Sequence, residues 1–278
     1  MSRSKHKGRL DQLLQEQRPD LSRSRVQAEI MAGKVLVNGQ VYDKPGTLIE
    51  SSASIELLEP ENPYVSRGGL KLEGAIKDFN LSVADLTVLD VGASTGGFTD
   101  CLLQKGARIV YALDVGYGQL DYGLREDPRV VIMERFNVRH LKENDLPETP
   151  DLAVIDVSFI SLSKVLPVLG QLNIPAILAL IKPQFEAGRE DATKGEGVIR
   201  DPGLHRKILI NNIQLSCSYS YCCRGITYSK WPGPKGNLEY FIYYKRKESG
   251  SCTCQSEYFS IASNIVDQAH LVLLRPKK

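Results

Sequence analysis

The chain of 278 residues lacks several features that would place it in common functional classes. It contains no Gly-Lys-Ser/Thr tripeptide, so a phosphate loop of the nucleoside-triphosphatase kind is excluded. The longest apolar run, 174–181, is interrupted by Pro175 and is far shorter than the ~20 residues that span a bilayer. No apolar run follows the basic N-terminus, as a signal peptide requires. We therefore expect a cytoplasmic protein with no membrane partner.

The six cysteines show no spacing that is typical of a metal site. Paired Cys-x-x-Cys ligands, which structural zinc sites need, are absent from the sequence. The sequence therefore predicts no bound metal and reduced thiols at all six positions. These positions are Cys101, Cys217, Cys222, Cys223, Cys252 and Cys254.

Net charge is also small, but its distribution is uneven. The formal net charge is +2, and the first 45 residues hold nine Arg or Lys against five Asp or Glu, which is +4. The remaining 233 residues therefore carry −2. A basic N-terminal end favours an anionic partner for that part of the chain.

The first sixty residues have the pattern of a small α+β module. Leucine spacing predicts a helix over 9–17, and Ser22 is a suitable N-cap for a second helix over 23–32 that ends at Gly33. Residues 34–41 read as strand, Asn-Gly turn and strand, and 54–58 alternate as a further strand. We expect a module over residues 1–60 and a linker over 61–66. Residues 67–278 are left for a larger domain.

A glycine-rich turn follows an apolar strand in the middle of the chain. Residues 86–99 read Leu-Thr-Val-Leu-Asp-Val-Gly-Ala-Ser-Thr-Gly-Gly-Phe-Thr, with Asp90 at the end of the strand. Glycines at such a turn let the backbone approach a ligand closely. Asp114 ends the next strand 24 residues later, near the offset of roughly 20 at which an acidic group meets ribose hydroxyls. A ligand with a ribose but no phosphates fits, such as S-adenosylmethionine, and an ordinary βα turn is the alternative.

Strand and helix patterns alternate through the larger domain. This rhythm predicts an α/β fold of Rossmann-like type, in which a parallel sheet has helices on both faces. Two late strands, 225–228 and 238–244, are expected to form an antiparallel edge. The other strands are predicted at 87–91, 108–113, 129–133, 152–157 and 175–182, and the helices at 70–79, 97–105, 162–171, 203–214 and 258–271.

Charged residues stand next to several of these apolar segments. Asp156 and Lys182 each close an apolar strand, Glu239 opens a late strand, and Lys71 lies on the helix before the glycine turn. Ligands of open α/β sheets bind beyond the carboxyl ends of the strands, and a lysine at such a place is costly unless it is paired. These four residues either converge in one neutral cluster or form unrelated ion pairs.

The N-terminal module resembles an RNA-binding module that is shared by a ribosomal small-subunit protein, many pseudouridine synthases and some aminoacyl-tRNA synthetases. The likeness rests on Arg9-Leu-Asp, Ser22-Arg23, the segment from Gly33 to Gly39, and Lys44-Pro45. It implies that basic residues contact structured RNA, whereas a solvated charged face is the alternative. The residues expected to bind RNA are Arg3, Lys5, Arg9, Arg23, Arg25, Lys34, Lys44 and Arg67.

The larger domain resembles the FtsJ-like ribose 2′-O-methyltransferases, and the whole chain resembles the TlyA family. Matching phrases include Ser66-Arg-Gly-Gly-x-Lys71, Asp156-Val-Ser-Phe-Ile-Ser-Leu, Ile181-Lys-Pro-Gln-Phe-Glu and Gly-Asn-x-Glu239. The resemblance implies a Lys-Asp-Lys-Glu tetrad formed by Lys71, Asp156, Lys182 and Glu239. We expect Lys182 to be the general base for a ribose 2′-hydroxyl, that of a cytidine in ribosomal RNA, and the other three to orient and charge-balance it.

The same resemblance implies S-adenosylmethionine as the methyl donor. Asp114 is expected to accept from the ribose, Asn137 to contact the adenine edge, and Asp90 either to hold the methionine ammonium or to cap a helix. Ribosomal subunits are the expected partners of a monomer or weak dimer. Two alternatives are a non-catalytic RNA-binding assembly factor and a haemolysin. The full set of expected cofactor contacts is Asp90, Gly92, Ala93, Ser94, Gly96, Gly97, Phe98, Asp114 and Asn137.

Overall fold

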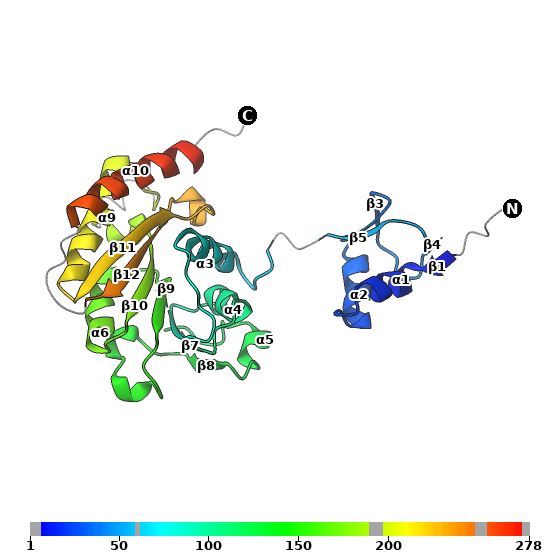
Figure 1. Ribbon diagram of the computed structural model, residues 1–278, viewed down its shortest axis with the longest axis horizontal. Coiled ribbons are helices and arrows are strands. Elements are labelled where there is room, and N and C mark those ends of the chain that lie inside the picture. The colour runs from blue at the N-terminus through cyan, green and yellow to red at the C-terminus, as the bar shows by residue number, and fades with distance from the viewer. Residues whose placement is uncertain (1–6, 59–61, 189–196, 248–254, 274–278) are drawn as a thin grey trace. The chain divides into compact units, whose positions relative to one another are not determined.

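The computed structural model describes residues 7–58, 62–188, 197–247 and 255–273, which form two compact units (Figure 1). The first unit is Met1–Pro63 and the second is Tyr64–Lys278. Tyr64 and Val65, which belong to the expected linker, are attached to the second unit: Tyr64 is 7% exposed, and the Val65 amide donates to Asp100 over 2.8 Å. Within the described ranges no helix is long and apolar enough to cross a bilayer.

The first unit packs two helices on short strands. Its apolar core consists mainly of helix and strand residues that the leucine and valine spacing places inward, among them Leu10, Leu14, Val26 and Ile30. Ser22 caps the second helix by accepting from the Arg25 amide, as predicted. The elements are α1 Leu10–Gln17, α2 Arg23–Met31, β2 Val35–Val37, β3 Gln40–Tyr42 and β5 Ile55–Leu57, together with β1 Lys7–Arg9 and β4 Leu48–Glu50.

The second unit is built on a seven-stranded sheet in the order β11-β12-β10-β9-β6-β7-β8. Strands β10, β9, β6, β7 and β8 run parallel, and β12 runs antiparallel to both of its neighbours. The parallel sheet with an antiparallel edge confirms the predicted fold class. The strands are β6 Thr87–Val91, β7 Ile109–Leu113, β8 Val130–Met133, β9 Leu152–Ile155, β10 Ala176–Ile181, β11 Tyr221–Tyr228 and β12 Tyr240–Arg246.

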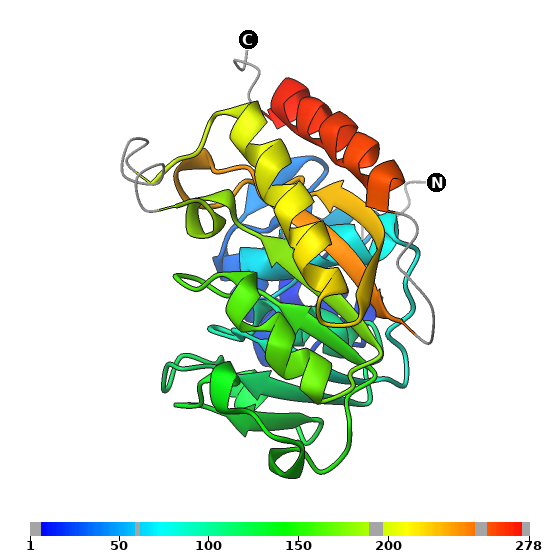
Figure 2. The ribbon, with the colours of Figure 1, turned by 90° about the vertical axis from the view of Figure 1, so that its left-hand side faces the viewer.

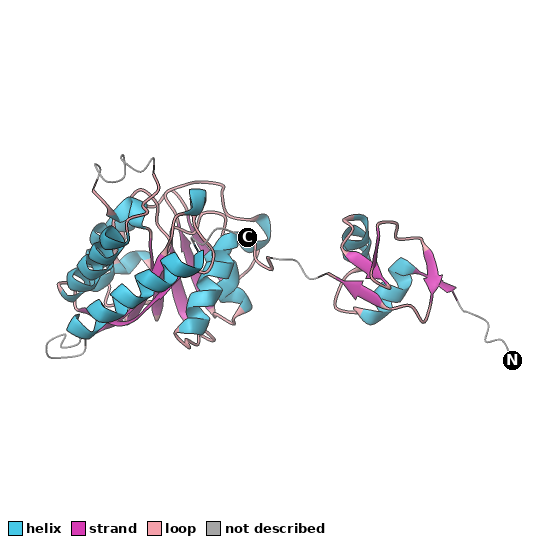
Figure 3. Cartoon of the chain, turned by 90° about the horizontal axis from the view of Figure 1, so that it is seen from above, coloured by secondary structure: helices cyan, strands magenta, loops and turns pink. Residues whose placement is uncertain are grey.

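Helices cover both faces of this sheet (Figures 1 to 3). On one face lie α6 Leu166–Gln171, α9 Pro202–Cys217 and α10 Gln255–Leu273, and on the other lie α3 Arg67–Asp78 and α4 Gly97–Gln104. Successive residues of β7 alternate between the two cores: Val110 and Ala112 face α3 and α4, whereas Tyr111 and Leu113 face the opposite layer. The side chains alternate because successive residues of a strand point to opposite faces of the sheet.

Three details differ from the sequence-based expectation. Helix α3 begins at Arg67, three residues early, because Ser66 accepts from the Gly68 amide and caps it. The helix expected over 162–171 is split into a 3₁₀ turn, η3 Leu162–Lys164, and α6, with Pro167 in the first turn of α6. Cys222 is disulfide-bonded, so the expectation of six reduced thiols is wrong; Cys101, Cys217 and Cys223 form no disulfide.

Candidate functional site

The glycine turn between β6 and α4 has a backbone that other residues would not adopt. Gly92 has φ +91°, and a Cβ there would lie 2.7 Å from the Asp156 carbonyl oxygen. Gly96 has φ +94°, and a Cβ there would lie 2.2 Å from Leu124. The turn therefore brings the end of β6 against the start of the segment that follows β9.

Gly97 lets α3 and α4 meet at this turn. A Cβ at Gly97 would lie 2.1 Å from the Ser66 hydroxyl and 3.0 Å from the Gly69 amide nitrogen. Phe98, the next residue, is buried and stacks on Phe241 with ring centroids 6.2 Å apart. The first turn of α4 is therefore fixed between the first turn of α3 and the sheet.

Asp114 stands at the carboxyl end of β7 and closes the glycine turn from the side. Its carboxylate accepts from the Ser94 amide at 2.8 Å and from the Gly116 amide at 2.6 Å. It borders a cavity of about 560 Å³, which we call the Asp114 pocket. Asn137 also lines this pocket, and its side-chain oxygen accepts from the Arg139 amide at 3.1 Å to cap the 3₁₀ turn η1 Val138–His140.

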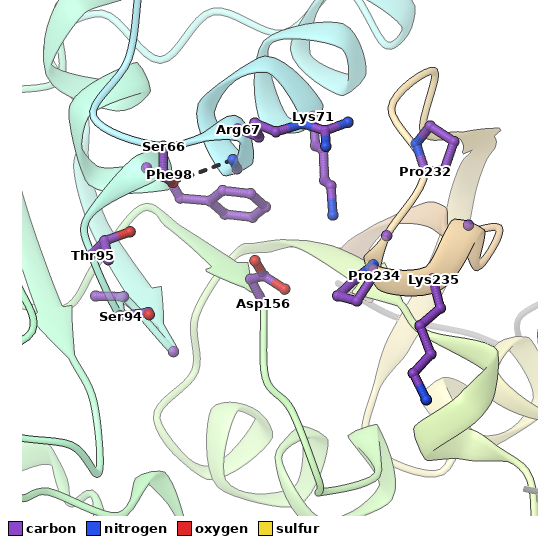
Figure 4. Close-up of a pocket in the computed structure, with 16 residues that line it drawn as sticks. Ser66, Arg67, Lys71, Ser94, Thr95, Phe98, Asp156, Pro232, Pro234 and Lys235 are labelled. Carbon is purple, nitrogen blue, oxygen red and sulfur yellow. Dashed lines mark hydrogen bonds between the residues drawn. The ribbon is translucent and has the colours of Figure 1, made fainter. Parts of the chain in front are cut away.

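A second cavity of about 570 Å³, the Lys71 pocket, adjoins the first one and shares Gly92, Ser94 and Asp156 with it. Figure 4 shows Lys71 of α3 and Asp156 reaching into this cavity opposite the loop that carries Pro232 and Pro234. The expected cofactor contacts Ala93, Gly97 and Phe98 line it as well.

Two lysine–carboxylate pairs lie at the same edge of the sheet. Lys71 Nζ is 2.6 Å from Glu239 Oε2, and Lys182 Nζ is 2.5 Å from Asp156 Oδ1. Both lysine side chains are only 11% exposed. Asp156 and Lys182 follow the carboxyl ends of the adjacent strands β9 and β10. Glu239 reaches the same edge because β12 is antiparallel and its first residue pairs with the last residue of β10.

Electrostatics link the two pairs into one group. Glu239 is fully buried, and burial raises its pKa, whereas the ammonium groups of Lys71 and Lys182 act in the opposite direction and Asp156 adds to the rise. Its Oε1 has no hydrogen-bond partner among the described residues. The two pairs therefore lie close enough for Lys182 and Asp156 to act on Glu239, which favours one cluster over unrelated ion pairs.

Asp90 is placed differently from the other expected cofactor contacts. It is fully buried and lines neither of the two pockets; its Oδ2 accepts from the Thr99 hydroxyl of α4 at 2.7 Å. Burial raises the pKa of Asp90 to about 7. A hydrogen bond from the Thr99 backbone in the first turn of α4 acts against this rise and favours the helix-capping alternative. Gly96 also lines neither pocket and acts through the shape of the turn.

The basic residues expected to bind RNA are divided between the two units. In the first unit Arg9 pairs with Asp11, and Arg25 and Lys34 both pair with Glu29. Arg23 and Lys44 are exposed and form no ion pair with any residue in the described part of the chain. Arg67 belongs to the second unit and lines the Lys71 pocket. Arg3 and Lys5 lie outside the described residues.

Two residues after β9 were not singled out from the sequence. Ser158 accepts from Lys182 Nζ at 3.1 Å. Phe159 is 90% exposed, has φ +64°, and its ring lies 4.8 Å from that of Phe185 beside the Asp114 pocket. A strained backbone at an exposed aromatic residue makes this position a candidate for function. The signal in the sequence was an aromatic residue three positions after the charged residue that follows a strand.

Comparison with known families agrees with this geometry. The FtsJ-like methyltransferase family matches residues 64–246, and the S4 domain matches residues 8–55. The cofactor of the chain is S-adenosylmethionine, and the cradle that Gly92 keeps free of a side chain and the carboxylate of Asp114 fit its methionine and ribose parts.

Relatives match most of the chain. The chain is 44% identical to the 16S/23S rRNA (cytidine-2′-O)-methyltransferase TlyA of Mycobacterium tuberculosis, over 82% of this chain and 87% of that protein. It is 46% identical to Hemolysin A of Brachyspira hyodysenteriae, over 85% and 99%. A solved structure, "Putative hemolysin from Streptococcus thermophilus", is 40% identical, with a TM-score of 0.72 and coverage of 97% and 98%. The chain belongs to the TlyA family, in which an S4 domain precedes an FtsJ-like methyltransferase domain.

Proposed function

We propose that this protein methylates the ribose 2′-hydroxyl of a cytidine in ribosomal RNA. The observation that carries the proposal is the convergence of Lys71, Asp156, Lys182 and Glu239 beside the glycine turn. A ribose hydroxyl is a weak nucleophile and needs a base, and a lysine held by charged neighbours can supply one. The name of the M. tuberculosis relative supports ribosomal RNA and cytidine as the substrate.

Lys182 is the proposed general base. S-adenosylmethionine supplies an electrophilic methyl group and its own leaving group, so the protein contributes alignment and proton transfer. In its neutral form Lys182 Nζ takes the 2′-hydroxyl proton while the new O–CH₃ bond forms. Asp156 and the Ser158 hydroxyl, at 2.5 and 3.1 Å from Nζ, hold the amine in place and stabilise the ammonium that results.

Lys71 and Glu239 form the second half of the proposed machinery. Glu239 is fully buried and pairs with Lys71, which lines the Lys71 pocket. The positive charge of Lys71 orients the nucleotide. All four residues come from one chain, which supports action as a monomer. A ribosomal RNA substrate supports action in the cytoplasm.

The cofactor contacts follow from the two adjoining pockets. We assign the adenosine part to the Asp114 pocket, where Asp114 accepts from the ribose hydroxyls and Asn137 borders the adenine. Backbone at Gly92 and Ala93 lies against the methionine part. Asp90 acts indirectly in this assignment, because it fixes the turn through Thr99. Phe159, exposed at the rim of the Asp114 pocket, is suited to stack on a base of the RNA.

Transfer of labelled methyl groups tests the proposed function. Ribosomal subunits from a strain without this activity are incubated with the protein and labelled S-adenosylmethionine, and the RNA is then hydrolysed with alkali. We expect one labelled site that resists cleavage, since alkaline hydrolysis needs a free 2′-hydroxyl. Label in a base, which leaves the backbone cleavable, would contradict the proposal. Tight RNA binding without label would favour the assembly-factor alternative.

A further inference from the structure

One partly buried carboxylate near the site has no part in the chemistry described so far. Glu186 ends the short helix α7 Pro183–Glu186, which begins directly after Lys182. It accepts from the Ser161 hydroxyl at 2.9 Å and from the Leu162 amide at 2.8 Å. Burial raises the pKa of Glu186, and the hydrogen bonds from Leu162, Ser161 and Asn212 act against this rise.

The partners of Glu186 belong to the loop that starts at Asp156. This loop carries Asp156 and Ser158, which both contact Lys182 Nζ, and it ends where Leu162 begins η3. The loop is therefore attached to α7 at three places: by the contacts of Lys182 near its beginning, by the ring contact of Phe159 with Phe185, and by the contacts of Glu186 near its end. Lys182 is the N-cap residue of α7, and its carbonyl accepts from the Glu186 amide at 3.3 Å.

Strain in the loop makes an anchor necessary. Phe159 lies between the contacts of Lys182 and those of Glu186 with φ +64°, a conformation that costs about 1–3 kcal/mol for a residue with a side chain. Ser158 and Phe159 are both exposed, and the Phe159 ring contacts Phe185. Loss of the Glu186 contacts removes the polar anchor near the end of the loop and lets it relax, so that Asp156 and Ser158 lose their fixed distances to Lys182.

We propose that Glu186 is a positioning residue for methyl transfer, which holds the 156–162 loop so that Asp156 and Ser158 stay in contact with Lys182 Nζ. The inference rests on the proposed function for its effect on rate. Displacement of a catalytic group by about 1 Å can cost roughly 100-fold in rate. Residues 156–160 of this loop also line the Asp114 pocket, so a loosened loop is expected to weaken cofactor binding as well as to slow transfer.

The test compares Glu186→Ala, Glu186→Gln and Ser161→Ala with Glu148→Ala. Glu148 is a matched control because it also accepts from a hydroxyl, that of Thr87 at 2.8 Å. Thr87 lies at the amino end of β6, whereas the candidate site lies at the carboxyl ends of the strands. For Glu186→Ala we expect kcat for ribosomal RNA to fall about 10- to 100-fold. The Kd for S-adenosylmethionine should rise along with this loss, because residues 156–160 line the pocket assigned to adenosine, whereas Glu148→Ala should change neither constant. Glutamine keeps an acceptor for the Leu162 amide and should restore most of kcat, and Ser161→Ala, which removes one contact, should fall between.

Amide hydrogen exchange separates this inference from the proposed function. Glu186→Ala should speed exchange at the Ser158–Leu162 amides, and Glu148→Ala should not, whether or not the protein turns over RNA. Unchanged exchange in that segment would overturn the inference, as would a loss of kcat that Glu148→Ala reproduces at equal loss of Tm. If the wild type transfers no methyl group while the exchange result holds, the proposed function fails and the anchoring role stands.

Discussion

At the scale of single residues, the site combines four charges that sum to zero in a nearly buried space. Lys71 and Glu239 are the more buried pair, with exposed fractions of 11% and 0% for their side chains. Such a pair costs desolvation free energy, and removal of one partner leaves the other charge uncompensated. Loss of either residue of this pair should therefore lower the stability of the protein more than loss of a residue from an exposed ion pair.

Replacement of Glu239 by alanine tests this link. We expect the free energy of unfolding to fall by about 3–5 kcal/mol, because Lys71 then lacks a partner in a buried place. Urea denaturation followed by circular dichroism measures it. Asp156→Ala is the comparison, since that carboxylate is 23% exposed and should cost less. Equal losses for the two variants would contradict the argument from burial.

Asp90 predicts a pH dependence of stability. Its pKa is about 7 in the folded protein and 3.8 in the reference state, so folding takes up a proton between these pH values. The contribution of Asp90 to stability is thus present below about pH 4 and is lost as the pH rises through 7. Asp90→Asn removes this contribution. The difference in unfolding free energy, variant minus wild type, should increase from pH 5 to pH 8, and a constant difference would refute the prediction.

Gly92 offers a test of the cofactor cradle. Alanine at Gly92 meets both a left-handed φ and a backbone oxygen at 2.7 Å, whereas alanine at Gly118 meets a left-handed φ of +69° and open space. Both variants should lose about 1 kcal/mol or more of stability through strain. Only Gly92→Ala should abolish binding of S-adenosylmethionine in calorimetry. Intact binding by Gly92→Ala would mean that the turn does not form the cofactor site.

At the scale of elements, the meeting of the four charged residues was partly readable from the sequence. Asp156 and Lys182 follow apolar strands, so their place at the carboxyl edge of a parallel sheet could be predicted. Glu239 begins a strand, and it reaches this edge only because β12 is antiparallel. The sequence suggested that direction but carries no register, and the pairing of Ile181 with Tyr240 comes from packing.

Short elements were the ones that sequence patterns missed. Strands β1 and β4 have three residues each, and helices α5 Tyr122–Arg125 and α7 have four, which is too few for a period to show. The capping of α4 by Asp90 depends on the distance to Thr99 in space. Ser158 and Phe159 belong to the motif that begins at Asp156. Their roles depend on contacts with Lys182 and Phe185, which lie more than twenty residues further along the chain.

The loop before β12 predicts a further effect at this scale. Asn237 is 3% exposed; its side chain accepts from the Ile199 amide and donates to the carbonyls of Gly197 and Pro234. Asn237→Ala should lower the free energy of unfolding by about 1–3 kcal/mol, because buried backbone groups lose their partners. It should also lower kcat, since Pro234 lines the Lys71 pocket. Urea denaturation and initial rates measure the two effects, and an unchanged kcat would show that the loop tolerates the loss.

At the scale of the whole molecule, the chain divides its tasks between two units. The basic surface of the first unit includes residues whose charge is balanced within the unit, such as Arg25 and Lys34 on Glu29. Arg23 has no such partner among the described residues and is fully available to a phosphate. The composition of the first 45 residues made this division predictable, whereas the ion pairs that reduce the free charge were not.

Reversal of charge at Arg23 tests the role of the first unit. Arg23→Glu should weaken binding to ribosomal RNA and reduce the slope of log K against log salt by about one, because one phosphate contact is lost. Binding of S-adenosylmethionine should not change. Arg224→Glu, which makes the same charge change at an exposed position of β11, is the control. Equal effects of the two variants on the salt slope would point to net charge in place of a contact at Arg23.

The account depends most on Lys182 as the base. A single-turnover experiment with enzyme in excess over RNA measures the rate of methyl transfer directly. It compares the wild type with Lys182→Ala, Lys182→Arg and the exposed control Lys207→Ala. Arginine keeps the positive charge but stays protonated, so it cannot accept the proton. We predict that both Lys182 variants bind S-adenosylmethionine normally and react about 10²–10⁴ times more slowly, while Lys207→Ala reacts as the wild type does. A wild-type rate for Lys182→Arg would contradict the assignment of Lys182 as the general base.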